Sequence, residues 1–172
     1  MTLLCLLLAA AATEAPDTYV LEAGMPVWDV ASGDLDGNGK ADVLALCADV
    51  ESRPLRKRLS VYLSGDGNGY PSRPSFNLEL APDTGSVFLT ELDGKAPLEL
   101  AVTDAEGAQI YAYGDGGLRV VRKVEFASLL PSRVKKPIFL EDIAVDLDGD
   151  GIDEWLVPVP TGFEIRSADG LL

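Results

Sequence analysis

A short acidic motif that occurs three times constrains the fold of this chain more than any other feature. The copies read DLDGNGKADVLAL from Asp34, ELDGKAPLELAV from Glu91 and DLDGDGIDEWLVPV from Asp146. Their first residues are 57 positions apart (34 to 91) and 55 positions apart (91 to 146). A motif that returns at a nearly constant spacing of this size indicates a repeat protein, in which each copy forms one structural unit.

Each acidic motif stands among segments that are typical of β-strands. The apolar stretches PVWDVASG, SVFLT and PIFLEDIAV precede the three copies. Two strand-like runs joined by a short turn follow, for example LELAVTD and AQIYAYG in the second copy and EWLVPV and FEIRSA in the third. A further turn, written GDGNGY, GDGGL or ADGLL, leads in the first two copies to SFNLEL and RVVRKVEF. Each unit therefore contains four predicted short strands.

These patterns predict an all-β protein. No segment after the N-terminal apolar run has the sustained apolar period near 3.6 residues that an amphipathic helix requires. Four short strands in a unit of about 50 residues are typical of a β-propeller blade. We expect about three four-stranded antiparallel β-propeller blades, as in a partial or truncated propeller, over residues 26–81, 86–127 and 137–172. The segment YVLEAG near Tyr19 is expected to be the fourth strand of a preceding unit.

The first and third acidic loops have the ligand spacing of a calcium loop. Oxygen-bearing side chains stand at positions one, three, five and nine: Asp34, Asp36, Asn38 and Asp42 in the first loop, and Asp146, Asp148, Asp150 and Glu154 in the third. Position seven, Lys40 or Ile152, would add its backbone carbonyl. Calcium takes six to eight hard oxygen ligands, and carboxylates this close repel one another unless a cation lies between them. We therefore predict that both loops bind Ca²⁺.

The second acidic loop departs from this pattern. It has Glu91, Asp93 and Glu99 at positions one, three and nine, but Lys95 at position five. An ammonium group at that position competes with a bound cation. We expect Lys95 to replace the metal with an internal salt bridge, and the second loop to bind no metal.

Two other interpretations of the acidic loops use the same residues. An EF-hand loop also begins D-x-D-x-D-G, but it needs an acidic residue at position twelve, where Ala45 and Val157 stand, and a helix on each side. Both requirements fail. The loops also match ordinary turns, because Asp, Asn and Gly are common turn formers. That second interpretation stays open from the sequence alone.

The composition favours a cation as partner and excludes several classes of site. The chain has 28 acidic and 14 basic residues and a formal net charge of −14, which disfavours nucleic acid and anionic lipid as partners. It has no His and two Cys, so the usual ligands of zinc and copper are nearly absent. The lack of His also excludes Ser/His/Asp and Cys/His catalytic sites.

The N-terminal sequence indicates export. The apolar run in MTLLCLLLAAAATEA is followed by small and then polar residues, as in a signal peptide, and it is too short to span a bilayer comfortably. We predict a signal peptide over residues 1–15, a repeat domain over 16–172, and a secreted, periplasmic or cell-surface protein without a membrane span. Cleavage would remove Cys5 and leave Cys47, in the apolar run VLALCA, as a small core residue.

The complete loops DLDGNGKAD at Asp34 and DLDGDGIDE at Asp146, with the GDG turns around Asp66 and Asp115, resemble the FG-GAP/VCBS repeat family. That family includes the propeller blades of integrin α-subunits and many bacterial secreted proteins. The resemblance implies calcium-loop blades in a bacterial exported protein. The literal Phe-Gly and Gly-Ala-Pro motifs are missing, so the chain is similar to the looser bacterial form of the repeat. Because propellers of this family have about seven blades, three units predict a piece of a longer protein, or a truncated one.

The sequence favours a non-catalytic binding or scaffold module, with calcium stiffening its loops and a protein or carbohydrate as ligand. The alternative is an acid-type hydrolase, because Asp83-Thr84-Gly85 matches the D-T-G turn of aspartic proteases, or a non-catalytic part of a larger secreted enzyme. The D-T-G triplet follows Ala81-Pro82 instead of a buried strand, which indicates a turn between units.

Two groups of side chains carry expectations about packing. Trp28 and Trp155 lie in or beside predicted strands and are expected to be core residues. The basic run at Arg53, Arg56, Lys57 and Arg58 is expected at a solvated hairpin tip, with a docking patch for an acidic partner as the alternative.

Overall fold

The computed structural model describes residues 18–65, 69–104, 106–127, 130, 135–140, 143–167 and 170–171. The predicted signal peptide and the turns at Asp66 and Asp169 lie outside these residues. In the described part the regular structure is entirely β. The strands are β1 (Val27–Gly33), β2 (Asp42–Asp49), β3 (Arg56–Tyr62), β4 (Phe76–Leu80), β5 (Ser86–Thr90), β6 (Glu99–Thr103), β7 (Gly107–Gly114), β8 (Gly117–Glu125), β9 (Ile138–Phe139), β10 (Ala144–Val145), β11 (Glu154–Val159), β12 (Gly162–Ser167) and β13 (Gly170–Leu171).

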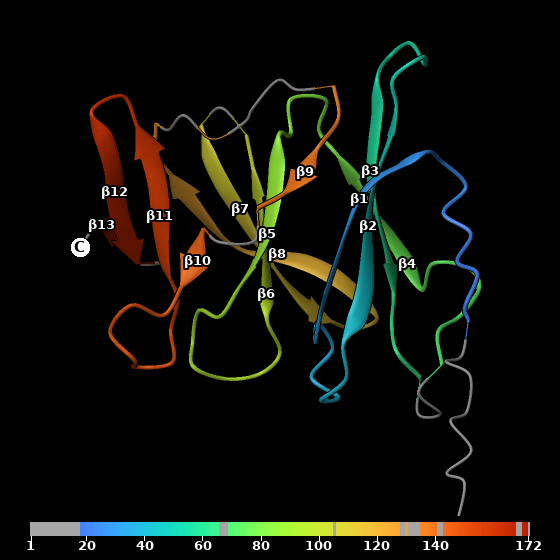
Figure 1. Cartoon of the computed structure of the whole chain (residues 1–172), viewed down its shortest axis with the longest axis horizontal. Helices are drawn as coiled ribbons and strands as arrows, with labels where there is room; N and C mark the ends of the chain where they lie inside the picture. The colour runs from blue at the N-terminus through green and yellow to red at the C-terminus, as the bar shows by residue number, and fades with distance from the viewer. Residues whose placement is uncertain are drawn as a thin grey trace, which may run out of the picture.

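The strands form three sheets that stand in a row (Figure 1). The strand orders are β1-β2-β3-β4 in the first sheet, β8-β7-β6-β5-β9 in the second and β10-β11-β12-β13 in the third. All pairings are antiparallel except that of β5 with β9, which is parallel. The predicted all-β class with antiparallel sheets is therefore confirmed.

The apolar faces of the sheets pack against one another in two interfaces. Between the first and second sheets lie Leu44, Leu46, Leu59 and Val61 from one side and Val87, Leu100 and Val102 from the other. Between the second and third sheets lie Phe88, Ala101 and Ile110 against Trp155 and Val157. Neighbouring residues of β6 thus point to opposite interfaces, which explains why Leu100, Ala101 and Val102 are apolar in succession.

The N-terminal segment before β1 covers the remaining face of the first sheet. Ala23 is buried with Ala45, Cys47 and Tyr62, and Leu21 packs against the same cluster. This segment was expected to be a strand, but it contains none and contacts the chain through isolated hydrogen bonds such as Glu22 N–H to the Ser72 carbonyl (2.7 Å). The predicted burial of Cys47 is confirmed, since its side chain is fully buried.

The segment PIFLEDIAV does not form one strand of the third sheet, which its apolar pattern had predicted. Its first part, β9, pairs with β5 of the second sheet, with the Ile138 and Leu140 N–H groups bonded to the carbonyls of Gly85 and Val87. The Phe139 N–H also donates to the Asp29 carboxylate of β1 (2.7 Å). Only β10, two residues long, belongs to the third sheet. The reason is that β5 has a free edge whose carbonyls accept these hydrogen bonds.

Two packing expectations were wrong in part. Trp155 is fully buried, as predicted, but Trp28 is 39% exposed. The indole N–H of Trp28 donates to the Ala48 carbonyl, and the Lys136 ammonium lies 3.6 Å from the centre of the Trp28 ring. In the basic run, Lys57 and Arg58 lie in β3 and not at a solvated tip. Lys57 is buried and its ammonium donates to the Thr84 carbonyl, and burial lowers its pKa although the Asp83 charge opposes this.

The leucine at position two of each acidic loop reports how far each sheet is covered. Leu35 is fully buried between the first and second sheets. Leu92 is half-buried and packs against the cluster between the second and third sheets. Leu147 is 50% exposed. The same residue in the same loop position therefore passes from core to surface along the row of sheets.

This gradient gives a matched pair of substitutions. Leu35→Ala should lower the free energy of unfolding by about 2–5 kcal/mol, because it leaves a cavity between two sheets. Leu147→Ala should change it by less than about 0.5 kcal/mol, because the side chain is half in solvent. Urea denaturation of both variants measures the difference. Equal losses for the two variants would contradict the burial of Leu35 between the sheets.

Candidate metal-binding loops

The first acidic loop connects β1 to β2 and is closed by its own carboxylates. The carboxylate of Asp34 accepts hydrogen bonds from the Gly37 and Gly39 N–H groups (2.8 and 2.9 Å). Both glycines have φ of 78°, a left-handed conformation that other residues rarely adopt. Asp36 accepts from the Asn38 N–H (3.1 Å). The glycines thus let the loop turn back so that its amides point at the first carboxylate.

Asp42, at position nine, ties this loop to the sheet. It is fully buried at the start of β2, and its two oxygens accept from the Leu35 N–H (2.9 Å) and the Ser64 N–H (2.8 Å). A buried charge requires such hydrogen bonds to offset its loss of hydration. Ser64 lies 22 residues from Asp42 and was not among the predicted site residues. The sequence feature that could have indicated Ser64 is its place directly before the GDG turn.

The third loop, between β10 and β11, repeats these contacts. Asp146 accepts from the Gly149 and Gly151 N–H groups (2.6 and 3.0 Å), as Asp34 does in the first loop. Glu154 is buried and accepts from the Leu147 N–H (2.9 Å). Two segments separated by 112 positions (34 to 146) therefore adopt one hydrogen-bond pattern.

Three carboxylates converge in each of these two loops. Oxygens of Asp34, Asp36 and Asp42 lie within 4.8 Å of one another, and so do oxygens of Asp146, Asp148 and Glu154. At that distance two unit charges repel by about 1 kcal/mol in water and about 3.5 kcal/mol at an effective dielectric constant of 20. The backbone N–H donors offset part of this repulsion. A divalent cation between the oxygens would reverse its sign.

The other predicted ligands occupy the rim of the loops. Asn38 accepts from the Lys40 N–H (2.8 Å) and donates to the Asp36 carboxylate (3.2 Å) and to Ser64. Asp150 accepts from the Ile152 N–H (2.8 Å) and lies outside the group of three carboxylates. Each of these side chains thus accepts a hydrogen bond from the residue at position seven, Lys40 or Ile152. The carbonyls of those two residues were the predicted backbone ligands.

The second loop, between β5 and β6, has a different charge arrangement. In the described part of the chain, no set of three carboxylates converges here as in the other two loops. Glu91 uses one oxygen to accept from the N–H groups of Asp93 and Lys95 (3.1 and 3.0 Å). The predicted salt bridge of Lys95 is wrong, because among the described ion pairs none includes this exposed side chain.

Glu99, at position nine of the second loop, holds an unfavourable charge. Its carboxylate accepts from the Leu92 N–H (3.2 Å). Burial raises the pKa of Glu99, and the charges of Glu91 and Asp93 raise it further, although the hydrogen bond from Leu92 opposes both. The second loop therefore brings acidic groups near one another without the convergence of three carboxylates seen in the other two loops.

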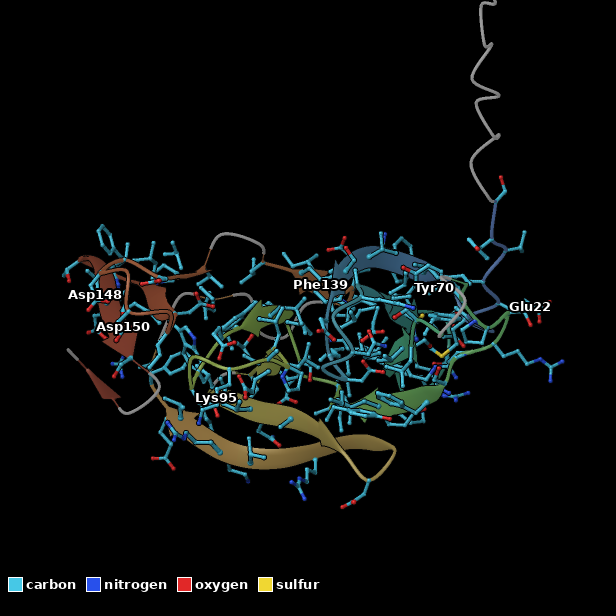
Figure 2. The ribbon with its side chains drawn as sticks, turned by 90° about the horizontal axis from the view of Figure 1, so that it is seen from below. Glu22, Tyr70, Lys95, Phe139, Asp148 and Asp150 are labelled. Carbon is cyan, nitrogen blue, oxygen red and sulfur yellow. The ribbon has the colours of Figure 1, made fainter. Side chains whose placement is uncertain are left out.

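Each acidic loop contacts the next one along one edge of the molecule, the lower edge in Figure 1. The Leu98 N–H donates to the Asp34 carbonyl (3.0 Å), and the Asp153 N–H donates to the Glu91 carbonyl (2.7 Å). In both cases position eight of one loop bonds to position one of the loop before it. The Glu91 N–H in turn donates to the Asp153 carboxylate (2.7 Å), a contact that no sequence pattern had predicted. Figure 2 shows Asp148 and Asp150 at one end of the molecule and Glu22 at the other.

Two further features lie apart from the acidic loops. A groove of about 470 Å³ lies between β1 of the first sheet and β5 and β9 of the second, and Val30, Ser32, Phe88 and Phe139 are among its lining residues. None of the loop carboxylates lines this groove. The D-T-G triplet forms a turn before β5, with Asp83 exposed and Thr84 buried.

Within the described residues, no helix has the length and apolar character needed to cross a bilayer. Comparisons with known protein families and with curated proteins give no match.

The raised pKa of Glu99 predicts a pH dependence. The folded chain binds a proton at Glu99 more tightly than the unfolded chain, so this group favours folding below its ordinary pKa of 4.5. That contribution is lost as the pH rises from 4.5 through the raised folded-state pKa. Glu99→Gln, which stays neutral and can still accept from Leu92, should raise Tm at pH 7 and reduce this dependence. Calcium-free melts from pH 4 to 7 measure it.

The control for this experiment is Glu106→Gln, an exposed residue in the turn before β7. It removes the same charge without the burial and should leave the pH profile of Tm nearly unchanged. A profile that responds equally to both substitutions would show that net charge, and not the environment of Glu99, sets the dependence.

Proposed function

We propose that this protein is a non-catalytic calcium-binding repeat module that acts outside the cytoplasm as a binding or scaffold domain. The observation that carries the proposal is the convergence of three carboxylates, within 4.8 Å, at positions one, three and nine of two separate loops. The same spacing, the same glycine turns and the same backbone hydrogen bonds recur in both loops. A chain of net charge −14 gains from bound cations in addition.

Calcium fits these loops better than other common metals. The converging ligands are carboxylate oxygens, and the sequence has no His, while Cys47 is buried in the core away from the loops. Hard oxygen donors favour calcium and magnesium over zinc and copper. Asp146 and Asp148 are exposed, so water can complete a shell of six to eight oxygens. Magnesium demands a smaller and more regular octahedron, which flexible loops of this kind seldom supply.

The proposal includes the finer architecture, in which the sheets are blades of a partial β-propeller of the FG-GAP/VCBS type. Three features support it: sheets of at least four strands, packing of their faces in a row, and an acidic loop at the same place in each sheet. The loops lie side by side on one edge, as radial repetition of a single unit requires.

The extracytoplasmic setting follows from the predicted signal peptide and from the weak sites that such loops form. Exposed loops with few rigid ligands bind calcium in the range of about 10⁻⁴ to 10⁻³ M, which suits the millimolar calcium outside cells. Bound calcium would stiffen the loop edge, and the stiffened sheets would present a surface to a protein or carbohydrate ligand. The groove between β1, β5 and β9 is a suitable place for such a ligand.

The test is calcium titration of the purified chain by calorimetry, with thermal melting in calcium and in chelator. We expect two sites. At a free calcium concentration ten times Kd, each site should add about 1.4 kcal/mol to the free energy of unfolding, because the ion binds the folded loops and not the unfolded chain. An absence of heat and of any calcium effect on Tm would reject the proposal.

Three substitutions at one loop position provide the controls. Asp36→Asn and Asp148→Asn should each abolish one site or weaken it at least about tenfold, since a charged ligand becomes neutral. Asp93→Asn, the same change in the second loop, should leave both sites unaltered. A loss of calcium binding in Asp93→Asn would show that the proposal places calcium in the wrong loops. Magnesium in place of calcium should give a smaller shift of Tm.

A further inference from the structure

The outer face of the third sheet is built from residues that alternate with its buried side chains. Cross-strand pairs share a face of a sheet, and Leu156 pairs with Ile165, Pro158 with Phe163 and Val145 with Glu154. Trp155 and Val157, which alternate with these residues along β11, face the second sheet. The outer face therefore carries Val145, Glu154, Leu156, Pro158, Phe163 and Ile165, and Leu147 lies beside it at the start of the acidic loop. Glu154 is buried on this face, where its carboxylate accepts a hydrogen bond from the Leu147 N–H.

Apart from the buried Glu154, this outer face is apolar and exposed. Phe163 is 67% exposed, and Ile165 and Val145 are 39% and 36% exposed. Ile165, which pairs with Leu156, matches Val61 of β3 and Ile110 of β7, which pair with Leu44 and Ala101 in the same way and are fully buried under the next sheet. Adjacent large apolar side chains without a cover are uncommon on a protein surface and mark interaction sites.

The acidic loops show what covers this position elsewhere in the row. Pro97, at position seven of the second loop, packs over Gly37, so that a Cβ on Gly37 would lie 3.4 Å from the Pro97 Cδ. Ile152, at position seven of the third loop, lies in the same way over Gly94, since a Cβ added to Gly94 would lie 3.9 Å from the Ile152 Cγ1. The equivalent glycine of the third loop, Gly149, has no neighbour within 4 Å on that side.

Two successive interfaces of this chain therefore use one set of contacts. Position eight donates its N–H to the carbonyl of position one in the preceding loop, position seven covers the glycine at position four, and the leucine at position two is covered. The third sheet offers the receiving half of each contact in the Asp146 carbonyl, Gly149 and Leu147. We propose that this outer face binds one further β-sheet unit of the same acidic-loop type in this register.

A second copy of this chain fits the surface less well. The first sheet of a second copy would have to present the face that carries Ala45, Cys47 and Tyr62. In this chain the segment at Leu21 and Ala23 already covers that face, and the three side chains are 4% exposed or less. Docking of a second copy would first require that segment to leave. A repeat unit whose corresponding face is free meets no such barrier.

The test joins one added repeat to the full chain through a flexible linker of about ten residues. The added unit is a second copy of residues 86–127, whose Leu100 face packs on the first sheet in the same register. Leu147→Cys supplies the probe in a chain that also carries Cys5→Ser, since the remaining Cys47 is fully buried and does not compete for the reagent. We expect the rate of thiol labelling at position 147 to fall at least about tenfold in the extended chain relative to the same variant without the added repeat.

Matched variants separate docking from a general effect. Val121→Cys, 51% exposed on β8, should label at the same rate with and without the added repeat. Phe163→Asp should restore rapid labelling at position 147 in the extended chain, and Val121→Asp should not. A second extended chain, carrying an added copy of residues 137–172, guards against failure of one unit to fold. Unchanged labelling in both extended chains overturns the proposal.

Sedimentation of the unmodified chain tests the other occupant. We expect a monomer at micromolar concentration. Self-association that Phe163→Asp removes and Val121→Asp leaves intact would assign this face to a second copy of the chain, and the proposal would then be wrong.

Discussion

One hydrogen bond recurs in all three acidic loops, and the arrangement of the sheets depends on it. The carboxylate at position nine accepts from the N–H of the leucine at position two, in Asp42 with Leu35, Glu99 with Leu92 and Glu154 with Leu147. The bond closes a turn of the chain at the start of the second strand of each unit. It also fixes the leucine at the mouth of the interface with the next sheet. Aspartate and glutamate both serve, because the longer side chain of glutamate still reaches the same donor.

This closed loop has an electrostatic consequence. In the first and third loops the acid at position nine is brought toward the acids at positions one and three, so the fold concentrates negative charge at the edge of those two sheets. Backbone N–H groups offset part of the repulsion between these carboxylates. In the second loop the charge is not gathered in the same way, and the raised pKa of Glu99 reflects burial next to Glu91 and Asp93. The loops at the two ends share the contacts of their first carboxylate, which accepts from the N–H groups of positions four and six, whereas in the loop between them Glu91 accepts from positions three and five.

The repeat explains packing as well as loop geometry. Each sheet uses alternate residues of its strands to contact the sheet before it and the sheet after it, so both faces are apolar. The first sheet has no sheet before it in the described chain, and the segment at Ala23 covers that face instead. The third sheet keeps the same alternation, which leaves Phe163 and Ile165 exposed. The exposure of these two residues is therefore a direct result of repeating one unit.

The sequence by itself determined the features that rest on contacts between near neighbours. The strands on either side of each turn follow from alternation and turn residues, and the two acidic loops follow from oxygen ligands spaced within nine residues. Only the tertiary structure decided the contacts between distant segments. The pairing of β9 with β5, the burial of Lys57 against the Thr84 carbonyl, the exposure of Trp28 and the bonds from Leu98 and Asp153 to preceding loops are of this kind. The physical reason is that local hydrogen bonds and side-chain periodicity are written in consecutive residues, whereas the occupant of a free strand edge or an apolar face depends on which segments the whole chain brings there.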